Sequence, residues 1–167
     1  MKTSGRNLGR RLLLLGDTLS RLKHRKGHGV HSPFVYGFVR KVLMSKGLCE
    51  VAGTALYDSL IADGVAKRRA KELHNLLEYI EGQSYSINEV EGDLSILLAD
   101  YPTEKLAEAL ATAKMEGVVL AICQPYDNRE RQSVVKALID GHRSTTVDNR
   151  AYILFFNNHL PKQHYRF

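Results

Sequence analysis

The sequence predicts an α/β fold with a small, mostly parallel sheet, and three observations support this prediction. Two short apolar runs, residues 94–99 and 118–123, each end in a polar turn that contains proline. A helical pattern follows each run, as expected for consecutive strand–turn–helix units whose strands are buried on both faces. Near the end of the chain, residues 144–147 and 151–156 are β-rich and predict an antiparallel hairpin.

The composition is that of a globular chain. Its 167 residues allow one ordinary domain with or without a small appendage, and 44% of them are apolar. No apolar stretch approaches the roughly 18 residues that a membrane span needs. Because the chain shows no secretory signal pattern, we interpret Cys49 and Cys123 as reduced thiols and expect a cytoplasmic protein.

Positive charge is concentrated at the start of the chain. Residues 1–46 contain eleven Lys and Arg against the single Asp17, whereas the remainder holds thirteen basic and seventeen acidic residues. This asymmetry predicts contact with a polyanion, either nucleic acid or an anionic membrane surface on the inner face of the membrane. The alternative is that these charges solvate a leucine-rich helix or face the acidic half of the same protein.

Residues 7–24 predict a basic amphipathic helix, because leucines recur at steps of three and four on one side. Such a helix can lie on a membrane surface, dock on protein or form a dimer seam. The candidate anion-binding side chains flank this stripe, continue into the following loop, and reappear at the start of a later helix. They are Arg10, Arg11, Arg21, Lys23, Arg25, Lys26, Lys67 and Arg68.

Three further helices are predicted before the first strand. Ser32 followed by Pro33 is a strong helix start and opens a helix over residues 33–45. Residues 54–63 and 65–81 predict two more, so residues 1–82 form a basic helical N-terminal region and residues 83–167 the α/β domain. The histidines between the first two helices have no acidic or thiol partner in sequence, so we expect no metal site there. They are His24, His28 and His31.

The second half of the chain predicts where ligands would bind. Residues 83–90 alternate as a strand does, and a tight turn at 91–93 leads into the strand 94–99. Pro102 opens a helix that Gly117 closes, and Asp127 with Glu130 predicts a capping box for the last helix. Ligands of such sheets bind beyond the carboxyl ends of the strands. The candidate binding residues are therefore Asp100, Tyr101, Gln124 and Tyr126.

Three stretches together resemble a family. Residues 28–36 (HGVHSPFVY), residues 118–139, and the ending at 151–156 with the tail 161–167 are similar to bacterial class I S-adenosylmethionine (SAM)-dependent methyltransferases. The resemblance covers both ends of the chain well and the middle poorly. It implies a reduced, mostly parallel Rossmann-like, methyltransferase-like sheet with a C-terminal antiparallel hairpin and an N-terminal helical extension.

The chain departs from this family where the family binds its cofactor. The family's first strand ends in an acidic, glycine-rich turn, and an acidic residue about one unit later binds the ribose. Here the strand 83–90 is followed directly by Glu91-Gly92-Asp93 and the next strand. Asp100 matches the acidic residue after the family's fourth strand, but no carboxylate follows the fifth until Asp127, so a hard metal ion lacks ligands.

We therefore expect a degenerate methyltransferase-like protein that binds no cofactor or metal and serves as a binding or assembly partner. One alternative is an active methyltransferase whose SAM site is completed by another subunit. The other is a nucleic-acid or membrane-surface module that uses residues 1–46. A truncated sheet also leaves an open edge, which we expect to be covered by the N-terminal helices or by a second copy of the chain.

Overall fold

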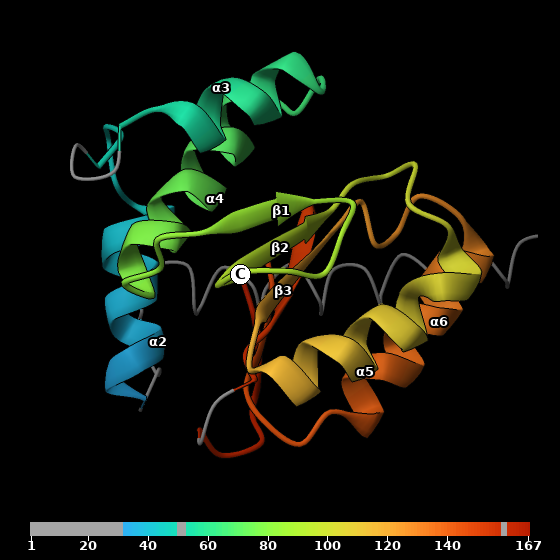
Figure 1. Cartoon of the computed structure of the whole chain (residues 1–167). Coiled ribbons are helices and arrows are strands. Elements are labelled where there is room, and N and C mark those ends of the chain that lie inside the picture. Colours follow the sequence, from blue (N-terminus) through green and yellow to red (C-terminus); the bar gives the residue numbers. More distant parts are fainter. Residues whose placement is uncertain (1–31, 50–52, 158–159) are drawn as a thin grey trace, which may run out of the picture.

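The computed structural model describes residues 32–49, 53–157 and 160–167 and has three layers. A six-stranded sheet lies between helices α2 to α4 on one face and helices α5 and α6 on the other (Figure 1). The strands are β1 (Tyr85–Ile87), β2 (Leu94–Leu97), β3 (Val119–Cys123), β4 (Thr146–Asp148), β5 (Tyr152–Phe155) and β6 (His164–Arg166). The helices are α2 (Pro33–Phe38), η1 (Val39–Leu43), α3 (Ala55–Ala62), α4 (Lys67–Tyr79), η2 (Thr103–Lys105), α5 (Leu106–Glu116) and α6 (Arg129–Gly141).

The strand order, β1-β2-β3-β5-β4-β6, confirms the predicted α/β class, a reduced Rossmann-like sheet. Strands β1, β2 and β3 are parallel, and β5 runs antiparallel to both of its neighbours, β3 and β4. The predicted hairpin is confirmed as β4 and β5. The tail forms β6, which pairs in parallel with β4 and was not predicted as a strand.

Each face of the sheet has its own core because successive strand residues point to opposite sides. Leu94, Ile96 and Phe156 pack with Phe38 and Leu73 under α2 to α4. On the other face the core lies under α5 and α6 and includes Leu97, Leu106, Leu110, Val135 and Phe155. The helices before residue 82 therefore share a continuous core with the strands that follow.

The first described helix begins as predicted and then changes type. Ser32 is the N-cap, and its hydroxyl accepts a hydrogen bond from the Val35 N–H at 3.3 Å. The α-helix gives way to a π-helix over Val39–Leu43 with Met44 as its C-cap, close to the predicted end at about residue 45. The predicted helix 7–24 and the three histidines lie outside the described residues. Among the described helices, none is both long and apolar enough to span a membrane.

The predicted capping box at Asp127 and Glu130 is wrong by one residue. Asn128 caps α6, and its side-chain oxygen accepts from the Arg131 N–H at 2.8 Å. Asp127 instead belongs to the turn that leaves β3, where its N–H donates to the Gln124 carbonyl at 3.2 Å. The helix start moved because the turn after β3 needs one more residue than the sequence pattern suggests.

The connection between β1 and β2 is the unusual element of the fold. Parallel neighbours ordinarily need a crossover of a dozen or more residues, but here residues 88–93 suffice. The predicted strand 83–90 is accordingly only three residues long. Asn88 reverses the chain at φ 59° and Gly92 at φ 75°. Residues 88–93, the return segment, pack against hydroxyls on the α5 face of the sheet. There the Glu91 N–H lies 3.1 Å from the Ser95 Oγ.

Substituting Gly92 tests how tight this return is. A Cβ on Gly92 would lie 2.8 Å from the Ser84 Oγ and 3.1 Å from its backbone carbon, whereas one on Gly117, also at φ 75°, meets nothing within 4 Å. We expect Gly92→Ala to lower the free energy of unfolding by roughly 2–4 kcal/mol and Gly117→Ala by only about 1 kcal/mol. Urea denaturation of both variants measures the difference. Equal losses of stability would show that the connection over residues 88–93 has space for a Cβ at residue 92.

Candidate functional site

The candidate site lies where β1 and β2 end. The helix before β1 covers one face of the sheet and the helix after β2 covers the other, so a crevice opens between the two strands (Figure 1). This crevice is an open cleft of about 580 Å³. Its lining consists of Asp63, Ile87, Asn88, Leu98, Ala99 and Asp100. Two carboxylates over apolar walls can hold a cation or a basic side chain.

Asn88 occupies the floor of this cleft. Its side-chain Oδ1 accepts from the Leu98 N–H at 2.8 Å, and its Nδ2 donates to the Asp100 carboxylate at 3.0 Å. Its backbone N–H donates to the Ile96 carbonyl at 2.9 Å. The residue that follows β1 thus fastens the end of β1 to the end of β2. A glycine at this position would leave the same space open to a ligand.

Arg131 fills the space between the ends of β2 and β3. The side chain projects from α6 and is 1% exposed. Its guanidinium donates to the carbonyls of Tyr101 at 2.8 Å, Leu98 at 3.0 Å and Cys123 at 3.2 Å. Burial lowers the pKa of Arg131 from its ordinary value, although Asp127 and Asp100 oppose the shift. The strand ends are therefore held together by one buried cation.

The four candidate binding residues do not converge on one cavity. Asp100 lines the cleft, whereas Tyr101 contributes its carbonyl to Arg131. Burial, with a smaller contribution from Glu108, raises the pKa of the Tyr101 phenol. Gln124 is exposed at φ 45°. Tyr126 points toward the hairpin, where its hydroxyl donates to Asp148 at 2.6 Å.

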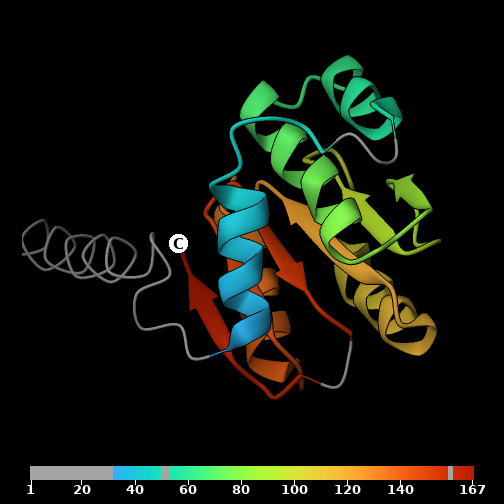
Figure 2. The same ribbon diagram turned by 90° about the vertical axis from the view of Figure 1, so that its left-hand side faces the viewer.

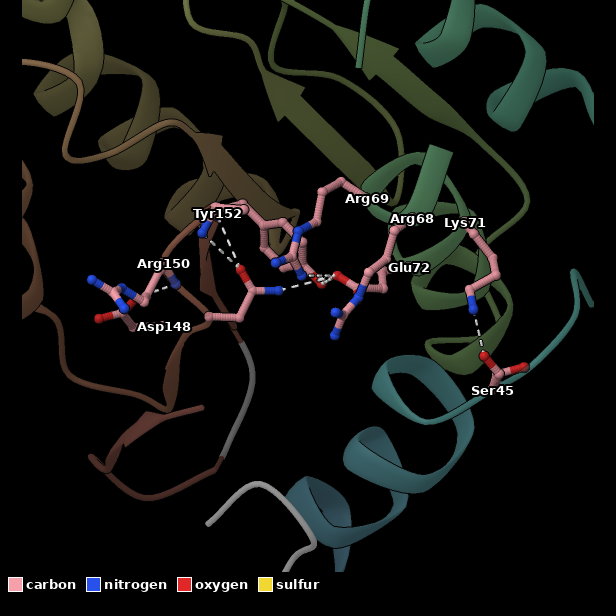
Figure 3. Close-up of polar contacts among 10 residues, drawn as sticks. Ser45, Arg68, Arg69, Lys71, Glu72, Asp148, Arg150 and Tyr152 are labelled. Atoms are coloured by element: carbon pink, nitrogen blue, oxygen red, sulfur yellow. Dashed lines mark hydrogen bonds and ion pairs between the residues drawn. The ribbon is translucent and has the colours of Figure 1, made fainter. Parts of the chain in front are cut away.

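Two basic residues at the start of α4 form ion pairs with a carboxylate of the same helix. Glu72 is fully buried and accepts from Arg68 at 2.9 Å and Arg69 at 2.6 Å (Figure 3). Asn149 and the Tyr152 hydroxyl each donate to the same carboxylate at 3.2 Å. The candidate anion-binding residue Arg68 is thus engaged within the chain. Lys67 is exposed, and the other six candidates lie outside the described residues.

Nucleophilic and metal chemistry find little support among the described side chains. Both cysteines are free thiols, but burial raises the pKa of Cys123 to about 12, which keeps that thiol protonated and inert. Burial and the adjacent Glu72 raise the pKa of Tyr152 well above its ordinary value. In the described ranges, no three His, Cys, Asp or Glu side chains gather as a metal site would require.

Sequence reasoning missed the residues that shape the site. Arg131 shares the buried side of α6 with Val135, so a charged residue at helical spacing from apolar ones was the available signal. Glu72 gave a similar signal beside Leu73 and Leu76. Asn88 gave no such signal, because its role depends on its positive φ and on the position of β2 beside it in the fold. Comparisons of the chain with protein-family models, curated proteins and solved structures find no match.

Replacing Arg131 tests whether the buried cation holds the strand ends together. Arg131→Met keeps most of the side-chain volume but removes the guanidinium donor from three carbonyls, of which only that of Leu98 is shown with a second donor, the Tyr101 N–H at 3.2 Å. We expect the free energy of unfolding to fall by roughly 2–4 kcal/mol. Arg129→Met, at an exposed position two residues earlier, is the matched control and should change it by less than about 0.5 kcal/mol. Similar values for the two variants would contradict this role.

Asp93 makes the β1–β2 connection sensitive to acid. Its carboxylate accepts from the N–H groups of Gln83 and Ser84 at 2.9 Å each and from the Ser84 hydroxyl at 2.8 Å. The Gln83 N–H and then the Ser84 hydroxyl lower the pKa of Asp93 below its ordinary value. The ionised form is therefore favoured by folding. Its contribution is present above the ordinary Asp pKa of about 3.9 and is lost as the pH falls through the folded-state pKa.

We expect Asp93→Asn to lower the free energy of unfolding at pH 7 and the difference from the original chain to shrink below about pH 4. Chemical denaturation across pH 3 to 7 measures it, with the exposed Glu116→Gln as control. A difference that stays constant across this range would mean that the charge of Asp93 does not contribute.

Proposed function

We propose that this chain is a methyltransferase-like protein that does not transfer methyl groups and acts as a binding or assembly partner. The observation that carries the proposal is the return from β1 to β2 within residues 88–93. A cofactor crevice of the family's kind needs glycines after the first strand and an acidic residue on a further strand. Here Asn88 takes the place of the glycine turn, and the chain goes directly into β2.

The residues present do not fit SAM. The Asn88 amide is bonded on both sides, to the Leu98 N–H and to Asp100, so a polar side chain occupies the position where the family's glycines let the backbone approach the cofactor. Asp100 is the acidic residue that the resemblance places near the cofactor, and it is engaged by Asn88. The cleft that remains is lined without glycine. Its acidic and apolar walls suit a protein segment better than an adenosine.

Titration calorimetry of the full chain with SAM and with its demethylated product tests this proposal. We expect no binding tighter than about 1 mM, which corresponds to roughly −4 kcal/mol. Micromolar binding that is lost in Asp100→Ala would overturn the proposal and favour the active enzyme whose site another subunit completes. Salt-dependent retention on RNA or on anionic vesicles, weakened by reversing Arg10 and Arg11, would favour the surface-binding alternative instead.

A further inference from the structure

The β1 edge of the sheet has no partner strand in the described part of the chain. Strand β1 pairs with β2 on one side only (Figure 1). Its residues Tyr85 and Ile87 are half-buried and pack against the core under α2 to α4. An unpaired edge presents backbone N–H and C=O groups to any segment that approaches. Natural proteins cover or pair such edges or protect them with short strands and charges, and the half-buried Tyr85 and Ile87 on this edge favour a covering partner.

The edge is acidic, which limits what that occupant can be. Between residues 72 and 104 the chain has eight acidic residues and no Lys or Arg. Around β1 the exposed carboxylates are those of Glu81, Glu89, Glu91, Asp93 and Asp100. Within the described residues, no Lys or Arg forms an ion pair with any of the five. The potential along this edge is therefore negative and attracts a basic segment.

The cleft at the end of β1 has the chemistry to receive a basic side chain. Asp63, from the end of α3, and Asp100 supply carboxylates, and Ile87 and Leu98 supply apolar walls. Lysine and arginine side chains bury an aliphatic stem while the charged end stays among acceptors. A cleft of about 580 Å³ with this lining accommodates such a side chain together with part of the segment that carries it.

The chain itself contains a segment of matching chemistry. Residues 1–31 carry eight Lys and Arg and one acidic residue, Asp17, together with a run of leucines. This segment enters the described structure at Ser32, the N-cap of α2. Figure 2 shows α2 next to β6 and β1 at the opposite end of the sheet. The point where the segment joins the described structure therefore lies near the β6 edge, opposite β1.

That position favours binding of the segment to the β1 edge of a second copy over binding to the β1 edge of its own chain. Five strand spacings of about 4.8 Å separate β6 from β1, roughly 24 Å. Both faces of the sheet between them are covered by helices, so a chain crossing to its own edge would have to pass over α2 to α4 or over α5 and α6 (Figure 1). A neighbouring molecule presents its segment to the edge without that detour.

We propose that the β1 edge and the adjoining cleft bind the basic N-terminal segment, residues 1–31, of a second copy of this chain. The inference deepens the proposed function and rests on it, since it names the partner of the assembly. The segment's charges meet the acidic rim, and its leucines cover Tyr85 and Ile87. The contact joins two different surfaces of the two copies, so it is heterologous.

Light scattering after size-exclusion chromatography of the full chain tests the inference. At low salt we expect a mass of at least two chains, falling toward the 18.8 kDa monomer as salt shortens the screening length. Glu89→Lys with Glu91→Lys should weaken association about tenfold or more and leave a monomer. The matched control, Glu108→Lys with Asp140→Lys, reverses two exposed charges on α5 and α6 and should associate as the original chain does.

A charge swap makes the test specific. Arg10→Glu with Arg11→Glu should also abolish association, and combining it with Glu89→Lys and Glu91→Lys should restore it. A monomer at every salt concentration, or no restoration in the combined variant, would overturn the inference. SAM binding by an associating chain would overturn the proposed function. The contact between the two copies would then stand, but not as the assembly role of a protein that transfers no methyl groups. A chain that neither binds SAM nor associates overturns this inference alone.

Discussion

The structure depends on one constraint: two parallel neighbours are joined by six residues, 88–93. So short a path works only if β1 is three residues long and if the chain turns sharply at both ends, at Asn88 and Gly92. The return segment lies on the α5 face, where Val90 packs into the core that a crossover helix would otherwise cover. The same path ends the sheet at β1, fills the crevice at its carboxyl end with Asn88, and leaves the edge open.

Two buried charges of opposite sign fasten the helical layers to the sheet. Arg131 connects α6 to the ends of β2 and β3 through three carbonyls, and Glu72 connects α4 to the hairpin through Asn149 and Tyr152. Each lies at the end of the sheet where the parallel strands finish. A site that binds ligands would keep its polar groups available at this end. Arg131, Glu72 and Asn88 are instead bonded to the protein itself, which agrees with a structural role for these three side chains.

The sequence was informative where a local pattern determines structure. The strand–helix units, the hairpin and the Ser32 cap follow from apolar spacing and capping chemistry, and all three are present. The capping box at Asp127 failed because an acidic residue can serve a turn as well as a cap. Strand β6 was missed because its three residues pair with β4, a partner that local pattern does not reveal. Tertiary contacts decide such elements, and one sequence contains no direct record of them.

The candidate site was predictable only in position. The rule that ligands bind beyond strand ends placed Asp100 at a cleft. It also grouped Asp100 with Tyr126, whose hydroxyl contacts Asp148 of the hairpin, and with Gln124, which is not among the residues that line this cleft. The short β1–β2 connection places Asn88 in the lining of the cleft and Glu89 and Glu91 next to the open edge. If two copies met β1 to β1, Glu89 and Glu91 of each would face like charges, and pairing would be opposed. A basic segment meets no such repulsion, so the charges that prevent edge-to-edge aggregation also select the partner.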